Sequence, residues 1–262
     1  MAKILTVTNQ KGGVGKTTTS VNLAASLAAM NKRVLLIDLD PQGNATMGSG
    51  VDKHELTLSI YEVLTDQAEA KQAIQSGLEA GYDLLGANGD LTAAEVELLD
   101  LARREFRLKM ALMPVQDNYD YVLIDNPPSL NLLTVNALAC SDGVIIPMQC
   151  EYYALEGISA LVGTIDRIQK RLNPKLKIEG ILRTMFDPRM SLTKDVSEHL
   201  MEYFGERVYR TVVPRNVRLA EAPSHGLPAI QYDKNSRGAL AYLALAGELI
   251  RRTERGELKH GS

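Results

Sequence analysis

A glycine-rich stretch at residues 9–19, NQKGGVGKTTT, constrains the fold more than any other part of the sequence. It follows the apolar run KILTVTN at residues 3–9 and precedes a helical pattern that begins near Lys16. A glycine-rich turn between a strand and a helix, ending in Gly-Lys-Thr, is typical of a phosphate-binding loop. The glycine expected at the start of the loop is replaced by Gln10, and a second lysine, Lys11, stands beside it. The sequence therefore predicts a strand–loop–helix unit that binds phosphates.

Short apolar runs alternate with helical patterns along the rest of the chain. The predicted strands are KILTVTN (3–9), RVLLID (33–38), YDLLGA (82–87), YDYVLID (119–125), GVIIPM (143–148), KIEGILRTMF (177–186) and RVYRTVV (207–213). The helical patterns begin near Lys16, Leu58, Thr92, Leu130, Tyr152, Ser191 and Ser236. Apolar strands joined by helical crossovers favour an α/β fold with a mostly parallel twisted sheet and helices on both faces. We expect a single domain over residues 1–262, with a short polar tail at about 253–262.

Composition and charge exclude several classes of protein. With 45% hydrophobic and 23% charged residues and no tryptophan, the chain is neither disordered nor fibrous. The net charge is −3, but residues 51–120 carry 14 acidic and 6 basic side chains, whereas residues 203–262 carry 6 acidic and 10 basic ones. A nucleic-acid partner would therefore have to use a local patch. Cys140 and Cys150 form no CxxC pair and are interpreted as buried free thiols.

The start of the sequence, MAKILTVTNQ, is too short and too polar for a signal peptide, and we interpret it as the first strand. No apolar run approaches the length that would span a bilayer. We therefore expect a cytoplasmic protein.

The residues of the loop have distinct expected roles. The loop itself, which turns tightly and aims backbone N–H groups inward, consists of Gly12, Gly13, Val14 and Gly15. Lys16 would reach the β- and γ-phosphates, and the Thr17 hydroxyl would bind Mg²⁺ directly. Thr18 would hold the α-phosphate.

Three aspartates follow predicted strands, where the ligands of such a sheet bind. Asp125 ends the apolar run VLID in a Walker B pattern and would order the water shell of the magnesium. Asp38 and Asp40 occupy alternate positions in RVLLIDLDPQGN, so on a strand they would point the same way. We expect Asp38 to assist the magnesium through water and Asp40 to orient the attacking water. The alternative is a strand end with ordinary aspartate turn chemistry.

Five stretches together resemble one family: KGGVGKTTT, LLIDLDPQGNAT, YDYVLID-PPSL, PMQCEYYALEG and VPRNVRLAEAPSHG. They are similar to the ParA/Soj chromosome- and plasmid-partitioning ATPases, which belong to the deviant Walker A, or MinD-like, group. The similarity runs from residue 3 to about residue 250. It implies ATP and Mg²⁺ as cofactors and a catalytic set of Lys11, Lys16 and Asp40. In particular, it implies that Lys11 reaches across an ATP-bound dimer to the phosphates of the facing subunit.

The resemblance also implies contacts to the adenine base. Pro214 and Asn216, in VPRNVR, match the family's base-contacting loop, and Thr184 and Met185 are expected near the base. The sequence departs from the usual family pattern at Asn126, Asn131 and Arg183.

Members of the family bind DNA without sequence preference when they are ATP-bound dimers. The resemblance implies that Arg189 and Arg218 contact DNA, with Lys194 as a weaker addition, whereas Arg215 could serve the nucleotide instead. It also implies a ParB/Spo0J-type centromere-binding partner that stimulates a slow intrinsic hydrolysis, and association with the nucleoid.

Three alternatives are disfavoured. A MinD-like cell-division ATPase would end in a membrane-binding amphipathic helix, but the tail GELIRRTERGELKHGS has no sustained apolar face. An iron–sulfur reductase would present thiolates at a dimer interface, and both cysteines lie away from the segment after Asp125. A non-catalytic, ATP-gated DNA-binding scaffold would differ only in whether Asp40 supports turnover.

Overall fold

One sheet of eight strands forms the centre of the molecule. The computed structural model describes residues 2–152 and 154–260, and for residues 256–260 the backbone alone. The strands, in the order β3-β4-β2-β5-β1-β6-β7-β8, are β1 (Lys3–Val7), β2 (Val34–Asp38), β3 (Ile74–Gln75), β4 (Asp83–Leu85), β5 (Tyr121–Asp125), β6 (Gly143–Gln149), β7 (Lys177–Phe186) and β8 (Val208–Pro214). All neighbours run parallel except β3 and β4. The predicted parallel sheet is confirmed, and the two-residue edge strand β3 is an addition to it.

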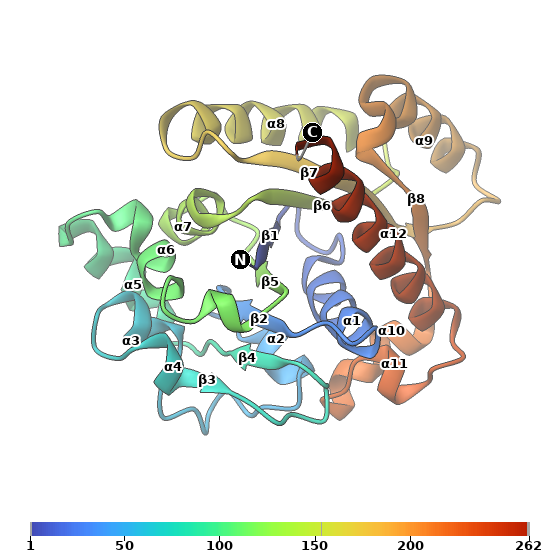
Figure 1. The fold of residues 1–262 in the computed structure, drawn as a ribbon. Coiled ribbons are helices and arrows are strands. Elements are labelled where there is room, and N and C mark those ends of the chain that lie inside the picture. Colours follow the sequence, from blue (N-terminus) through green and yellow to red (C-terminus); the bar gives the residue numbers. More distant parts are fainter. Residues whose placement is uncertain (1, 153, 261–262) are drawn as a thin grey trace.

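Helices cover both faces of this sheet (Figure 1). They are α1 (Lys16–Ala29), α2 (Asn44–Gly48), α3 (Ile60–Leu64), α4 (Ala70–Ala73), α5 (Leu91–Glu97), α6 (Arg107–Leu112), α7 (Leu132–Cys140), α8 (Ala154–Arg171), α9 (Ser191–Phe204), α10 (Val217–Glu221), α11 (Ala229–Tyr232) and α12 (Arg237–His260). Neighbouring strand residues face opposite cores: Leu36 packs in the core with α1 and α12, and Leu35 packs in the core with α3, α5 and α7. This two-sided burial explains why the strands are continuously apolar.

The carboxyl ends of the three central strands lie at one level. Val7 of β1 pairs with Asp125 of β5, and Asp38 of β2 pairs with the same Asp125. The segments that leave these strands therefore meet at one edge of the sheet. On the other side of β1, Phe186 at the end of β7 pairs with Pro214 at the end of β8.

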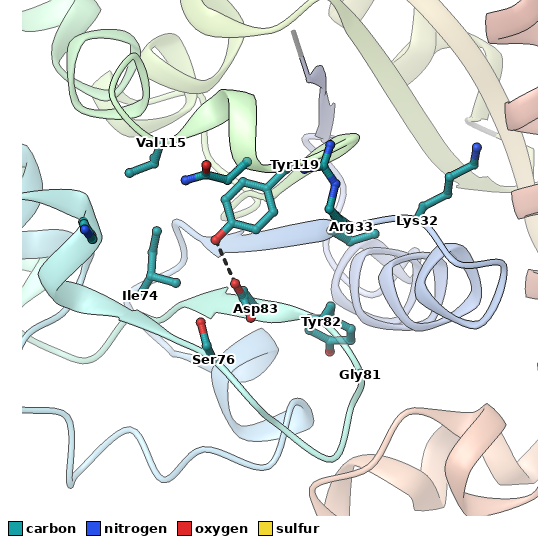
Figure 2. A pocket seen from close by; sticks show the side chains of 12 residues that line it. Lys32, Arg33, Ile74, Ser76, Gly81, Tyr82, Asp83, Val115 and Tyr119 are labelled. Atoms are coloured by element: carbon teal, nitrogen blue, oxygen red, sulfur yellow. Dashed lines mark hydrogen bonds between the residues drawn. The ribbon is translucent and has the colours of Figure 1, made fainter.

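A cavity of about 570 Å³ lies at the opposite, amino-terminal edge of the sheet. Figure 2 shows its lining, in which the Tyr119 hydroxyl donates to Asp83 at 2.8 Å while Lys32 and Arg33 stand at its rim. These residues lie at or just before the first residues of β2, β4 and β5. The cavity is therefore separate from the edge at which the functional segments meet.

Helix α12 continues to His260, so the described part of the predicted polar tail is helical. Its apolar face is buried against the core through Tyr242, Leu245 and Leu249. Among the residues that the structure describes, none of the helices combines the length and the apolar character that crossing a bilayer requires.

Candidate nucleotide site

The predicted phosphate loop joins β1 to α1, and two of its glycines have left-handed backbone conformations. Gly13 and Gly15 have φ angles of 72° and 84°, which side-chain-bearing residues rarely adopt. Asn9 holds the loop in place: its side-chain amide donates to the Pro147 carbonyl at 2.8 Å, and its side-chain oxygen accepts the Lys11 N–H at 3.0 Å. Added Cβ atoms at Gly12 and Gly13 would meet nothing within 4 Å. The loop is thus a preformed, unobstructed concavity at the start of a helix.

Lys16 lies at the base of this loop, on the first turn of α1. It is 8% exposed, and its Nζ donates to the Lys11 carbonyl at 3.2 Å. Burial lowers the pKa of Lys16, and the carboxylates of Asp125 and Asp40 act in the opposite direction. A largely buried ammonium with a backbone carbonyl as its hydrogen-bond partner is placed to exchange that partner for phosphate oxygens.

The Asp125 carboxylate accepts hydrogen bonds from two hydroxyl groups of α1. Its Oδ2 accepts from Thr17 at 2.7 Å, and its Oδ1 accepts from Ser20 at 2.7 Å. The residue is fully buried, and burial, followed by the neighbouring Asp38, raises the pKa of Asp125. Sequence reasoning missed Ser20, whose signal is its place four residues after Lys16 on the same face of the helix.

Asp38 and Asp40 lie in different environments. Asp38 is fully buried, and one of its carboxylate oxygens accepts both the N–H and the hydroxyl of Thr46, each at 2.8 Å. Burial raises the pKa of Asp38. Strand β2 ends at Asp38, so Asp40 lies in the following turn, where its Oδ1 accepts the Gln42 N–H at 3.0 Å. The strand ends at the residue where the predicted run RVLLID (33–38) ends, so alternation along a strand does not reach Asp40, although both aspartates are at the functional edge.

The pair Asp38 and Asp125 fits a magnesium ion. Two carboxylates on adjacent strands are buried together, and in the described structure neither forms an ion pair with a lysine, arginine or histidine. A cation next to the Thr17 hydroxyl would neutralise this charge, and oxygen ligands suit Mg²⁺. The described residues hold no group of three or more acids, histidines and cysteines that could bind a metal alone. The missing ligands would have to be water and phosphate oxygens, which is the usual way that Mg²⁺ binds with a nucleotide.

The residues expected near the base converge on the ends of β7 and β8. The Thr184 hydroxyl donates to the Val14 carbonyl at 2.8 Å, so it fastens β7 to the phosphate loop. Met185, with a φ of 48°, follows it. Asn216 accepts the Arg218 N–H at 3.1 Å and so begins α10, next to Pro214. The structure brings these four residues to one side of the loop.

The side chain of Lys11 lies at the exposed tip of the loop, whereas its backbone carbonyl accepts from Lys16. The Lys11 side chain is 52% exposed and forms an ion pair with Glu151, which follows β6. Glu151 was not predicted as a site residue, although it lies in the stretch PMQCEYYALEG that supports the family resemblance. The two lysines of the loop therefore face different surroundings: one is buried with the aspartates, and one is available at the surface.

The three departures from the family pattern have structural partners. Asn126 donates to the carbonyls of Val7 and Ile124, both at 3.2 Å, and so bridges β1 and β5. Asn131 caps α7 by accepting the Thr134 N–H at 3.1 Å. Arg183 is 6% exposed, and its guanidinium donates to Ser197 on α9 and to the Tyr209 carbonyl on β8. Each of these side chains holds two elements together.

The residues expected to contact DNA lie on two short segments at the surface. Arg189 precedes α9 and is ion-paired with Asp187 at 2.7 Å. Arg218, on α10, is paired with Glu221 at 2.8 Å and with Asp233 at 3.3 Å. Lys194, on α9, is exposed. Both arginines therefore already hold carboxylate partners in this structure.

A lysine at the tip of the phosphate loop, in addition to the one at its base, distinguishes this chain from most P-loop proteins. The chain is a P-loop ATPase of the deviant Walker A group, and the family model described as an AAA domain matches residues 2–178.

Comparison with known proteins shows the narrower family. The sporulation initiation inhibitor protein Soj of Bacillus subtilis is 55% identical over 95% of this chain and 98% of that protein. The chromosome partitioning protein ParA of Myxococcus xanthus is 52% identical over 96% of this chain and 89% of its own length. The chain belongs to the ParA/Soj family of partitioning ATPases.

A solved structure has the same fold over nearly the whole length. It is described as cobyrinic acid a,c-diamide synthase from Mycobacterium smegmatis with bound ADP and magnesium. Its TM-score is 0.86 at 39% identity, and the match covers 98% of this chain and 97% of that one.

Proposed function

We propose that this protein is a DNA-partitioning ATPase that binds Mg-ATP at the loop of residues 10–18 and dimerises around two nucleotides. The observation that carries the proposal is that the two lysines of the loop differ in burial: Lys16 is buried and Lys11 is exposed. Lys16 is buried with Asp125, where it serves the nucleotide of its own subunit. Lys11 is exposed, where it serves the nucleotide of a facing subunit.

Such a dimer depends on the nucleotide for a physical reason. Two triphosphates in one interface bring a large negative charge together, and a lysine from each facing subunit neutralises it. Without the phosphates, Lys11 is paired with Glu151 of its own chain and has no anionic partner across that interface. The state of the nucleotide thus controls the association of the subunits.

The residues of each site act together in hydrolysis. Gly13, Gly15 and Lys16 would hold the phosphates. The Thr17 hydroxyl, which donates to Asp125 in this structure, would bind the magnesium, and Asp125 and Asp38 would assist it through water. Magnesium, when bound, supplies positive charge to the phosphate oxygens. Asp40, in the turn beyond β2, orients the attacking water. Because this positioning is incomplete in one chain alone, we expect slow intrinsic turnover.

The nucleotide base lies against the ends of β7 and β8 in this proposal. Pro214 and Asn216 approach it from one strand, and Thr184 and Met185 from the other. The hydrogen bond from Thr184 to Val14 supports the proximity of this side to the phosphate loop.

The ATP-bound dimer contacts DNA without sequence preference through Arg189, Arg218 and Lys194, and it associates with the nucleoid. A ParB-type centromere-binding partner stimulates hydrolysis, and the monomers then leave the DNA. Contacts of this kind are made with phosphates, so the affinity falls steeply with salt.

Two features of the structure weigh against the alternatives. Helix α12 buries its apolar face on the core of its own chain, which leaves no such face free for a membrane over its described side chains. Cys140 and Cys150 are both buried, and burial raises the pKa of each thiol, so neither is presented as a thiolate at the surface of the chain. Ligation of an iron–sulfur cluster requires thiolates.

The test is a measurement of mass in solution with ADP and with ATP, each with and without non-specific DNA. We expect a monomer with ADP and a dimer with ATP. We expect a complex with DNA when ATP is present and none when ADP is present. A protein that stays monomeric with ATP and magnesium contradicts the proposed dimer, whatever its rate of hydrolysis.

A further inference from the structure

Besides the cavity described above, a groove of about 1390 Å³ lies between α12 and β8. Its residues on the sheet, such as Lys177 and Val208, are the first residues of β7 and β8. The groove is therefore at the amino-terminal edge, whereas the loop that binds nucleotide lies at the carboxyl-terminal edge. Figure 1 shows α12 crossing beside β8. A partner subunit that docks on the phosphate loop would leave this groove open.

The wall of the groove is a network of paired charges. The Arg252 guanidinium donates to Glu248 at 2.8 Å and lies 4.3 Å from the centre of the Tyr209 ring. Glu248 also accepts the N–H groups of Arg210 and Thr211, each at 2.9 Å. A second acid in the lining, Glu179, is paired with Lys3 at 3.1 Å. Glu248 and Glu179 therefore already have basic partners, Arg252 and Lys3.

Three further arginines line the groove and face solvent: Arg210, Arg251 and Arg255. Among the side chains that the structure describes, no carboxylate pairs with any of these guanidinium groups. Lys177, which also lines the groove, lies 3.9 Å from Glu179, and Glu206 is the remaining acid of the lining. The groove thus presents an excess of positive charge that its own wall does not compensate.

These arginines differ from the two that the family resemblance identifies. Arg189 and Arg218 are each held by carboxylates, so a phosphate must displace an existing partner there. In the groove, a phosphate need displace no carboxylate of the described side chains from Arg210, Arg251 or Arg255. Guanidinium groups bind phosphate in a bidentate manner, so unpaired arginines suit a phosphate ligand.

We propose that this groove is a second contact surface for the phosphate backbone of DNA, bound by Arg210, Arg251 and Arg255. The inference rests on the proposed function, because it names an additional surface for the same partner. Duplex DNA carries about one negative charge per 1.7 Å of its axis, so a single segment supplies phosphates to all three arginines. An extended acidic peptide offers at most one charge per about 3.3 Å.

The test compares two pairs of substitutions that remove equal charge. The groove variant is Arg251→Gln with Arg255→Gln on α12, and the control is Lys170→Gln with Arg171→Gln at the exposed end of α8. Binding of random-sequence duplex DNA and of a polyglutamate peptide is measured with ATP over a series of salt concentrations. ATP turnover and thermal melting confirm that both variants remain folded.

We expect the groove variant to bind DNA roughly tenfold more weakly at moderate salt, and its slope of log affinity against log salt to fall by about two. The control should match the unaltered protein. Equal losses in both variants, or an unchanged slope in the groove variant, overturn the inference. So does a groove variant that loses polyglutamate binding while its DNA slope is unchanged. If the unaltered protein binds no DNA with ATP, the DNA-binding part of the proposed function fails as well.

Discussion

The ammonium of Lys11 and the carboxylate of Glu151 form an ion pair at the tip of the phosphate loop. Both side chains are about half exposed, at 52% and 49%. Exposed pairs of this kind contribute little to stability, so phosphate oxygens can replace Glu151 at little cost. In the proposed dimer, Lys11 therefore leaves Glu151 and contacts the phosphates of the facing subunit.

Lys11 pairs with Glu151 of its own chain and is proposed to contact the phosphates of a facing subunit. Replacing Lys11 and Glu151 separately shows which of these two contacts turnover needs. Lys11→Ala should abolish measurable ATP turnover and weaken the ATP-dependent dimer, because the charge that neutralises the facing phosphates is lost. Glu151→Gln should change turnover by less than about fivefold, because only an exposed ion pair is removed. Steady-state turnover and sizing with ATP measure both effects. A Glu151→Gln protein as inactive as Lys11→Ala would show that the pair within one subunit matters more than the trans contact.

Asp40→Ala should retain ATP binding and lose hydrolysis, so the dimer should accumulate in the ATP-bound state. The carboxylate lies in the turn beyond β2, near Lys16, and it is the acid proposed to orient the attacking water. Asp52→Ala is a matched control, because Asp52 accepts the His54 N–H in the same local geometry in a different loop. Normal turnover in Asp40→Ala would remove this residue from the catalytic set.

The fold and the phosphate loop could be predicted because their signals are local. A continuously apolar strand indicates burial on both faces, and Gly-Lys-Thr after a strand indicates the loop. The edge strand β3 could not be predicted, since two residues carry no periodic pattern. The partners of the site were also beyond local reasoning: Thr46 binds Asp38 from α2, and Ser20 binds Asp125 from α1. Such contacts depend on how helices pack against the sheet.

The aspartates at residues 38 and 40 show the limit of an argument from strand periodicity. Alternate residues share a face only while the strand continues, and β2 ends at Asp38. The predicted run RVLLID (33–38) ends at the same residue, so alternation along the strand says nothing about where the side chain of Asp40 points.

Arg189→Ala combined with Arg218→Ala should weaken ATP-dependent binding of non-specific DNA while ATP binding is retained. Both arginines are exposed and paired with acids on their own or a neighbouring segment, so their loss should barely affect folding. Arg33→Ala with Arg104→Ala provides the control, because it removes two other exposed, ion-paired arginines. Fluorescence anisotropy at moderate salt measures DNA affinity. An affinity unchanged from that of the control would end the assignment of these two residues.

Glu248 should make a pH-dependent contribution to stability. Burial raises its pKa, but the N–H groups of Arg210 and Thr211, the Thr211 hydroxyl and Arg252 outweigh burial and leave the pKa below its ordinary value of 4.5. A lowered pKa means that the folded protein favours the carboxylate, so this stability is complete above pH 4.5. It is lost as the pH falls through the lower, folded-state pKa.

Glu248→Gln should therefore lower the free energy of unfolding by about 1–3 kcal/mol near neutral pH, because buried donors on β8 lose their charged acceptor. The difference from the unaltered protein should shrink as the pH falls below 4.5, where the native carboxylate becomes protonated too. Denaturant unfolding at several pH values measures it, with Glu254→Gln as an exposed control on the same helix. A difference that stays constant with pH would mean that the geometry of the side chain, and not its charge, joins α12 to the edge strand.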